Sequence, residues 1–145
     1  MNKLNNKIDF NKHNIVVFGR DKNINSKFVQ DIFYKEFDIT KEVFFFDELF
    51  DGFECFPEEP TLGGTIKLRN NVIDGVKSTL VSIIIGKRRG LTLIVDFSLN
   101  ALVENECIDL LRELVNTDSG CNLIITCEDP AELKDFNFDV SVDFN

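Results

Sequence analysis

Residues 14–26 read NIVVFGRDKNINS, and this stretch decides how the rest of the chain is interpreted. The β-branched run Asn14–Phe18 predicts a short buried strand. Gly19 follows the strand, and the polar residues Arg20–Asn25 predict a loop. Ser26 is a favoured N-cap residue, and apolar residues at helical spacing follow it. The stretch therefore predicts a strand, a loop and a helix that runs from Ser26 to about residue 37.

The rest of the chain continues this alternation of strands and helices. Further strands are expected at 42–46, 91–95 and 122–127, with a short last strand at 140–142. Helices are expected at 70–85 and 104–115, where apolar residues recur every three or four positions. Residues 47–64 are acidic, contain Pro, Gly and Phe, and predict a long loop. The pattern predicts an α/β fold in three layers: a mainly parallel sheet with helices on both faces.

Length and composition fit one domain. The chain has 145 residues, of which 43% are hydrophobic and 28% are charged, which is enough apolar material for a core. The Asn- and Lys-rich residues 1–13 are expected to form a polar lead-in, and residues 14–145 a single domain. No apolar run approaches the roughly 20 residues that cross a bilayer, and no signal peptide is recognised. We therefore expect a cytoplasmic protein without a membrane partner.

Charge and cysteine usage argue against two further kinds of site. The net charge of −9 disfavours nucleic-acid binding by the whole surface. The one local basic stretch, Lys87–Arg89, is typical of a solvated turn. The four cysteines form no C-x-x-C pair and lie far in sequence from the single histidine, His13, so a zinc site is poorly supported and reduced thiols are expected. The cysteines are Cys55, Cys107, Cys121 and Cys127.

The segment that begins at Gly19 has the length and setting of a P-loop, which reads G-x-x-x-x-G-K-[ST] between a strand and a helix. In a P-loop, glycines let backbone N–H groups cradle the phosphates, Lys neutralises them and Ser or Thr binds Mg²⁺. Ser26 matches the last position. Ile24 replaces the second Gly, where a β-branched side chain would be strained, and Asn25 replaces the Lys. The two most important ATP-binding residues are therefore missing.

The remaining parts of an ATPase site are also incomplete. Strand 91–95 ends at Asp96, the position of an Mg²⁺-binding acid, but Phe97 replaces the acid that would polarise the attacking water. Lys27 lies one residue late, about 100° further round a helix, and nothing fixes Lys22 near the phosphates. Ligands of parallel sheets bind beyond the carboxyl ends of the strands. Any site is therefore expected near Gly19, Asp47, Asp96 and Glu128.

The order and spacing of these segments resemble the genome-packaging ATPases of large double-stranded DNA viruses, in particular the poxvirus-like branch. The resemblance covers roughly residues 10–135 and implies a P-loop NTPase-like fold that is truncated at its C-terminus. It also implies a Gly-Lys pair at 24–25, two acids at 96–97, an Arg-rich turn at 117–120 and a sensor Gln near Glu128. This chain departs from all four. The matching segments are Gly19–Ser26, Tyr34–Lys35, Val43–Phe46, Phe50–Phe53, Pro57, 70–85, Leu91–Asp96 and Asn122–Cys127.

These departures predict a catalytically inactive, ATPase-like domain that holds no cofactor or metal and acts as a binding, regulatory or structural module. The resemblance implies a protein partner in the host cytoplasm: an active packaging ATPase, another virion protein or a host protein. Direct nucleic-acid binding is not expected. The acidic, aromatic residues 47–60 are one candidate contact surface, and packing of this segment on its own domain is the alternative.

Two other functions stay open. One is a divergent, active NTPase of viral DNA packaging that uses Mg-ATP. It would need Lys22 or Lys27 as its cation, an acid such as Asp47, Glu48 or Glu128, and Ser26 with Asp96 to hold Mg²⁺. The other is an unrelated, flavodoxin- or receiver-like α/β domain that binds a small ligand or a phosphate at the same strand ends.

Overall fold

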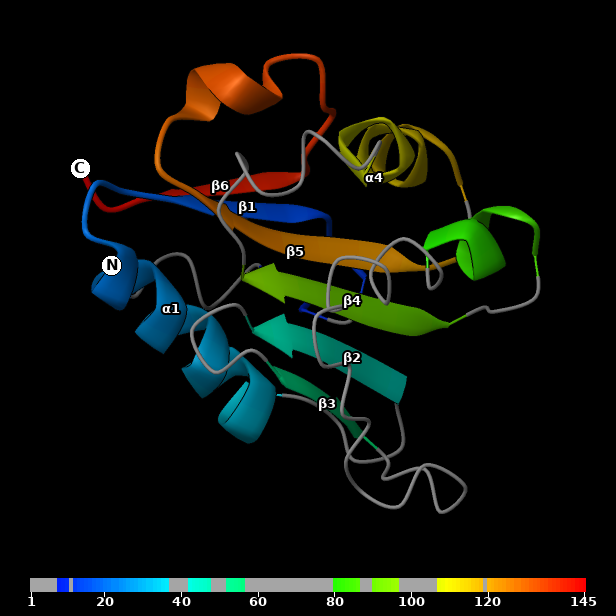
Figure 1. The fold of residues 1–145 in the computed structure, drawn as a ribbon, viewed down its shortest axis with the longest axis horizontal. Coiled ribbons are helices and arrows are strands. Elements are labelled where there is room, and N and C mark those ends of the chain that lie inside the picture. Colours follow the sequence, from blue (N-terminus) through cyan, green and yellow to red (C-terminus); the bar gives the residue numbers. More distant parts are fainter. Residues whose placement is uncertain are drawn as a thin grey trace.

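A six-stranded sheet with helices on both faces forms the centre of the protein (Figure 1). The computed structural model describes residues 8–10, 12–36, 42–47, 52–56, 80–86, 90–96, 107–118 and 120–145. Its strands are β1 (Ile15–Phe18), β2 (Glu42–Asp47), β3 (Gly52–Phe56), β4 (Leu91–Asp96), β5 (Asn122–Cys127) and β6 (Val140–Asp143).

The strand order is β3-β2-β4-β5-β1-β6. β2, β4, β5, β1 and β6 are mutually parallel, and β3 pairs antiparallel with β2 at one edge. This confirms the predicted α/β class and the mainly parallel sheet. The prediction of an uninterrupted loop over 47–64 is wrong, because residues 52–56 return along the outer edge of β2 and satisfy its hydrogen bonds.

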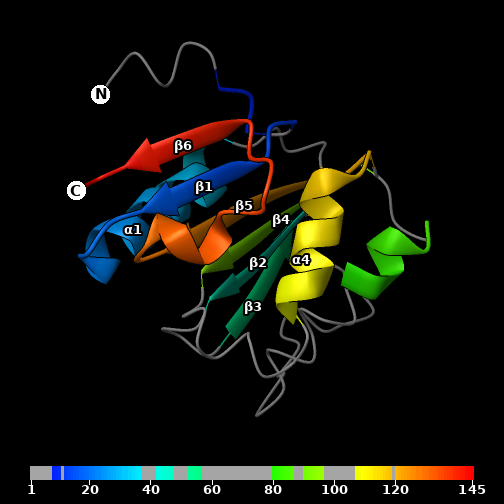
Figure 2. The same ribbon diagram turned by 90° about the horizontal axis from the view of Figure 1, so that it is seen from above.

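The helices cover both faces of the sheet, as Figure 2 shows for α1 and α4. Helix α1 (Lys22–Asp31) continues into the π-helical turn η1 (Ile32–Glu36). Helix α4 (Cys107–Asn116) confirms the helix that was predicted over 104–115. Of the helix predicted over 70–85, residues 80–84 are helical, and residues 70–79 lie outside the described ranges. The chain also forms a short 3-10 helix, η3 (Pro130–Leu133).

Each face of the sheet has its own apolar core, because alternate residues of a strand point to opposite faces. On β1, Ile15 and Val17 face α1, whereas Val16 faces α4. Strands β4 and β5 are buried along their whole length, as expected for central parallel strands. On the α1 face the core includes Val29, Ile32, Phe45, Ile94 and Ile124; on the α4 face it includes Phe44, Leu93, Leu111, Leu114 and Ile125.

Part of the predicted polar lead-in packs on the domain. Phe10 is 7% exposed and belongs to the core on the α1 face. The side chain of Asn122, at the start of β5, donates hydrogen bonds to the carbonyl oxygens of Phe10 and His13 at 3.0 and 2.8 Å. The hydroxyl of Thr92 donates to the same amide's oxygen at 2.7 Å. Asn122 therefore fixes residues 10–13 to the amino end of the sheet.

None of the helices in the described ranges is long and apolar enough to cross a bilayer.

Candidate functional site

The chain leaves two neighbouring strands, β1 and β5, in opposite directions. From β1 it enters α1, crosses one face of the sheet and continues to β2 (Figure 1). From β5 it passes through η3 on the other face and reaches β6 on the far side of β1. Such a divergence is a topological switch point, the place where open α/β sheets bind their ligands. The candidate site therefore lies between Gly19, after β1, and Cys127, at the end of β5.

Helix α1 begins earlier than the sequence predicted. Asp21 is its N-cap and accepts a hydrogen bond from the backbone N–H of Asn23 at 2.9 Å. Arg20–Asn25 is therefore not a loop, and Ser26 does not cap the helix. Asp21 and Ser26 are both good N-cap residues, and the earlier one is used because Ser26 then lies inside the fold, 3% exposed. Only Gly19–Asp21 remain between β1 and the helix, too few residues to wrap round a phosphate as a P-loop does.

The helical start changes the roles predicted for three residues of the motif. Ile24 is 46% exposed, so it neither fills the phosphate position nor suffers the predicted strain, because its backbone is helical. Lys27 is exposed, away from the buried side of α1. Lys22 is half-buried at the first position of the helix. Ile24 and Lys27 therefore lie outside the crevice between the ends of β1 and β5.

Asn25 fills this crevice instead. Its side chain is 1% exposed, and its Nδ2 donates to the carbonyl oxygen of Gly19 at 3.0 Å and lies 3.5 Å from that of Cys127. Its Oδ1 is 3.0 Å from the position that a Cβ atom on Gly19 would take. The Asn25 amide thus joins the diverging ends of β1 and β5, where the sequence motif would place a lysine beside phosphates. Gly19 is required here by the close approach of this amide.

Residues 144–145 cover the same crevice from outside. The backbone N–H of Phe144 donates to Phe18 O at 2.9 Å, and that of Arg20 donates to Asn145 Oδ1 at 2.9 Å. The Phe144 ring meets the ring of Phe28 edge to face, with centroids 5.4 Å apart. Phe144 Cβ also lies 3.0 Å from the Cβ position of Gly19. The backbone N–H group of Arg20, which could otherwise bind a phosphate oxygen, therefore already has an acceptor within the chain.

A buried polar cluster lies beneath the first turns of α1; it comprises Asn25, Ser26, Asp96 and Thr126. Asp96 is 0% exposed, and its Oδ1 accepts a hydrogen bond from the hydroxyl of Thr126 at 2.7 Å. Thr126 pairs with Val17, which faces α1, so this pair of side chains faces α1 as well. Within the described ranges, three oxygen atoms of the cluster are buried without a hydrogen-bond partner: Asn25 Oδ1, Ser26 Oγ and Asp96 Oδ2.

The cluster fits only part of what Mg-ATP requires. Carboxylate, hydroxyl and amide oxygens are ligands that Mg²⁺ accepts. Asn25 occupies the crevice and Phe144 covers it, so a triphosphate would have to displace both side chains. The described residues also hold no group of three or more His, Cys, Asp or Glu side chains placed to bind a metal ion.

The other predicted positions do not join this cluster. Glu128 follows β5 and is exposed, and Asp47 ends β2 level with Asp96, although its side chain is not described. Phe97 and Glu48 lie outside the described residues, as does the basic stretch 87–89. Sequence reasoning missed Thr126 and residues 144–145. A polar residue inside the apolar run of β5 was a signal for Thr126, whereas nothing local pointed to residues 144–145, which meet Gly19 only in the folded chain.

Comparisons with protein-family models, with curated proteins and with solved structures find no match to this chain.

Proposed function

We propose that the chain is a catalytically inactive, ATPase-like domain that serves as a binding, regulatory or structural module. The observation that carries the proposal is the Asn25 amide, which takes the space beside Gly19 and bonds to its carbonyl oxygen at 3.0 Å. A phosphate could enter only if this amide left; the carbonyl oxygen of Gly19 would then lose this donor, and that of Cys127 would keep the N–H of Gly19.

The chemistry of the remaining residues supports an inactive domain. Phosphoryl transfer depends on cations that neutralise the developing charge and on a group that orients the nucleophile. Lys27 and Glu128 are exposed outside the crevice, and the sequence has Phe97 where an acid would act. Asp96 is enclosed by the fold and bonded to Thr126. The proposal therefore assigns the domain no cofactor and no turnover.

The proposed relation to the packaging ATPases of large double-stranded DNA viruses rests on the collinear order of the segments in the sequence. The parallel sheet is compatible with this relation: Gly19 follows its first parallel strand, Asp96 ends the third and Glu128 follows the fourth. On this proposal the domain acts in the host cytoplasm on a protein partner, such as an active packaging ATPase or another virion or host protein. The acidic composition supports a protein partner over nucleic acid.

The flavodoxin-like version of the small-ligand alternative does not agree with the fold. Counted along the chain, the parallel strands of this protein lie in the order 2-3-4-1-5, whereas the flavodoxin-like order is 2-1-3-4-5. The first strand, β1, therefore has β5 and β6 as its neighbours and does not contact β2. A ligand site of the flavodoxin or receiver type is not proposed.

Thermal unfolding with Mg-ATP tests the proposal against the active alternative. An ATP site with a dissociation constant of about 10 µM would stabilise the fold by about 2.7 kcal/mol at 1 mM Mg-ATP. For a chain of this length that corresponds to a rise of roughly 5 to 11 °C in Tm. We expect no rise in Tm, no heat of binding in isothermal titration, and phosphate release at the level of the buffer.

Asp96 provides the matched control for turnover. The Asp96→Asn variant keeps the size of the side chain and its acceptor for Thr126. We expect wild type and variant to release phosphate at the same background rate. The divergent NTPase would be established instead by two results together: the wild type releases phosphate and the variant does not, and Mg-ATP raises the Tm of the wild type.

A further inference from the structure

Strand β6 ends the sheet on the side opposite β3 and has β1 as its only strand neighbour in the described part of the chain (Figure 2). The backbone N–H of Val140 donates to Asn14 O, and that of Phe144 donates to Phe18 O. Successive residues of a strand direct their N–H and C=O groups to opposite sides. The backbone groups of Ser141 and Asp143 therefore point away from β1, toward the open edge.

This outer edge is accessible and held in a fixed register. The side chains of Ser141 and Asp143 are exposed, whereas Val142 between them is 0% exposed in the core on the α1 face. Within the described ranges, no hydrogen bond uses the backbone N–H or C=O group of either exposed residue. Two donors and two acceptors are thus presented in the spacing that an added β-strand requires.

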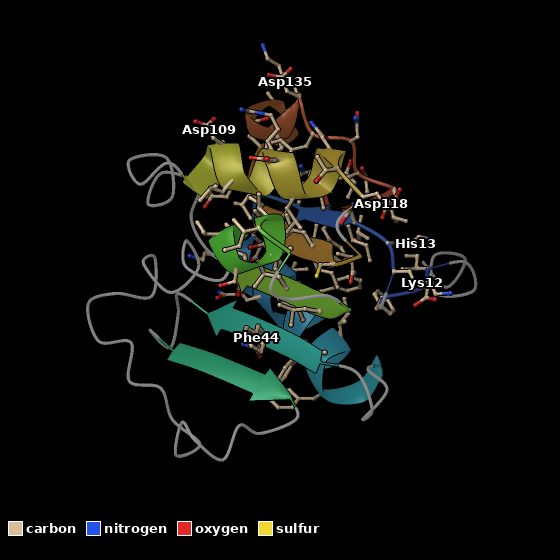
Figure 3. All side chains as sticks on the ribbon, turned by 90° about the vertical axis from the view of Figure 1, so that its right-hand side faces the viewer. Lys12, His13, Phe44, Asp109, Asp118 and Asp135 are labelled. Atoms are coloured by element: carbon tan, nitrogen blue, oxygen red, sulfur yellow. The ribbon has the colours of Figure 1, made fainter. Side chains whose placement is uncertain are left out.

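The surroundings of the edge are acidic. Residues 128–145 contain one basic residue, Lys134, while five of the carboxylates whose burial is described in this stretch are exposed. Asp135 lies on the outer side of the layer that covers the α4 face (Figure 3). Asp143 lies on β6 and Asp139 directly before it. Two copies paired through β6 would bring these two carboxylates of each copy together, which is unfavourable, whereas a basic segment would complement them. The exposed carboxylates belong to Glu128, Asp129, Asp135, Asp139 and Asp143.

We propose that the outer edge of β6 binds an extended, Lys- or Arg-rich segment of another protein, which adds to the sheet as a further strand. The backbone groups of Ser141 and Asp143 supply the hydrogen bonds, and the carboxylates of Asp139 and Asp143 select for positive charge. The interaction does not involve the crevice at Gly19, so the results of the nucleotide-binding tests do not affect it. Strand β6 also lies at the opposite end of the strand order from β3 (52–56), the described strand within the candidate contact surface 47–60.

A synthetic peptide of alternating Lys and Val, blocked at both ends, is the probe for this edge. Binding to the full chain is followed by fluorescence anisotropy and by changes in the amide NMR signals of residues 140–145. The control peptide carries Glu in place of Lys. We expect the Lys peptide to bind, with the largest signal changes at Ser141 and Asp143, and the affinity to fall as salt is added. The Glu peptide should not bind.

Two pairs of variants separate strand addition from simple charge attraction. Ser141→Pro removes the outward N–H group at an edge position that tolerates proline. It should weaken binding by about tenfold or more, while Ser141→Ala should bind as the wild type does. Asp143→Asn keeps the acceptor for Asn145 N–H and should weaken binding several-fold and reduce the salt dependence. Unchanged Tm values of the variants confirm that they are folded.

Three results would overturn the proposal. The first is equal binding of the Lys peptide by Ser141→Pro and the wild type, which would show that the backbone is not used. The second is no detectable binding of the Lys peptide, which would mean that the acidic residues only protect the edge from aggregation. The third is a dimer of the wild type that Ser141→Pro abolishes, which would assign the edge to a second copy of the chain.

Discussion

The substitution Asp96→Asn is expected to stabilise the protein, because Asp96 is a buried acid with an unpaired oxygen atom in the described part of the chain. The carboxylate is 0% exposed, and within the described ranges its Oδ2 has no hydrogen-bond partner. Leaving a buried polar atom unpaired costs about 1 to 3 kcal/mol, and more for a charged group. Asparagine keeps the oxygen that accepts from the Thr126 hydroxyl, removes the charge, and brings an NH₂ group into a cluster of unpaired oxygens.

One effect works against this gain. The hydrogen bond from Thr126 to a carboxylate becomes a bond to a neutral amide, which costs about 1 kcal/mol. The gain is larger, because the amide NH₂ group replaces an unpaired buried oxygen, which costs about 1 to 3 kcal/mol. We therefore expect a net rise of up to about 2 kcal/mol in the free energy of unfolding.

Equilibrium unfolding in urea, followed by far-UV circular dichroism, measures this change. The slope of the transition should be the same in both proteins, so that the midpoint alone reports stability. Asp109→Asn is the surface control: Asp109 lies on the exposed side of α4 (Figure 3), its side chain is 77% exposed, and it pairs with Arg112 at 2.9 Å. This control should change stability by less than about 0.5 kcal/mol.

Measurements with and without magnesium chloride decide between the two roles of Asp96. The proposed inactive domain gains no stability from Mg²⁺. A loss of stability in Asp96→Asn, combined with stabilisation of the wild type by Mg²⁺ that the variant lacks, would refute the reasoning and identify the buried polar cluster as a metal site.

Two further substitutions test the crevice and the amino end of the sheet. Gly19→Ala places a Cβ atom 3.0 Å from both Asn25 Oδ1 and Phe144 Cβ, and should cost about 1 to 3 kcal/mol in urea unfolding; a neutral result would mean that the crevice has room to spare. Asn122→Ala removes the donor of two carbonyl groups and the acceptor of the Thr92 hydroxyl. It should cost about 2 to 4 kcal/mol and speed amide hydrogen exchange at residues 12–14, and slow exchange there would show that another contact holds the segment.

The central strands and the layer structure could be predicted because they depend on local patterns. The apolar run of β4 is buried along its length, and such a run is readable without knowledge of its neighbours. The start of α1 could not be predicted in this way. Asp21 and Ser26 can both cap a helix, and the choice depends on which side chains the fold buries.

Contacts between distant segments account for the rest. The sequence motif placed Gly19, Asn25, Ser26 and Asp96 near one another, and the structure puts all four around the ends of β1, β4 and β5. The motif could not show that the Asn25 amide occupies the crevice, because this depends on the hydrogen bond from Asn25 to Cys127, 102 residues further along the chain.

The bridge that Asn25 makes between β1 and β5 has a consequence for how the domain behaves in a cell. Nucleotide-driven machines change shape because a phosphate holds their loops in one cycle state and releases them in the next. On the proposed function, the tie is the Asn25 side chain, which is part of the polypeptide, so it has no cycle and no dependence on the supply of ATP. Such a domain presents the same surface to its partners at high and at low ATP concentration.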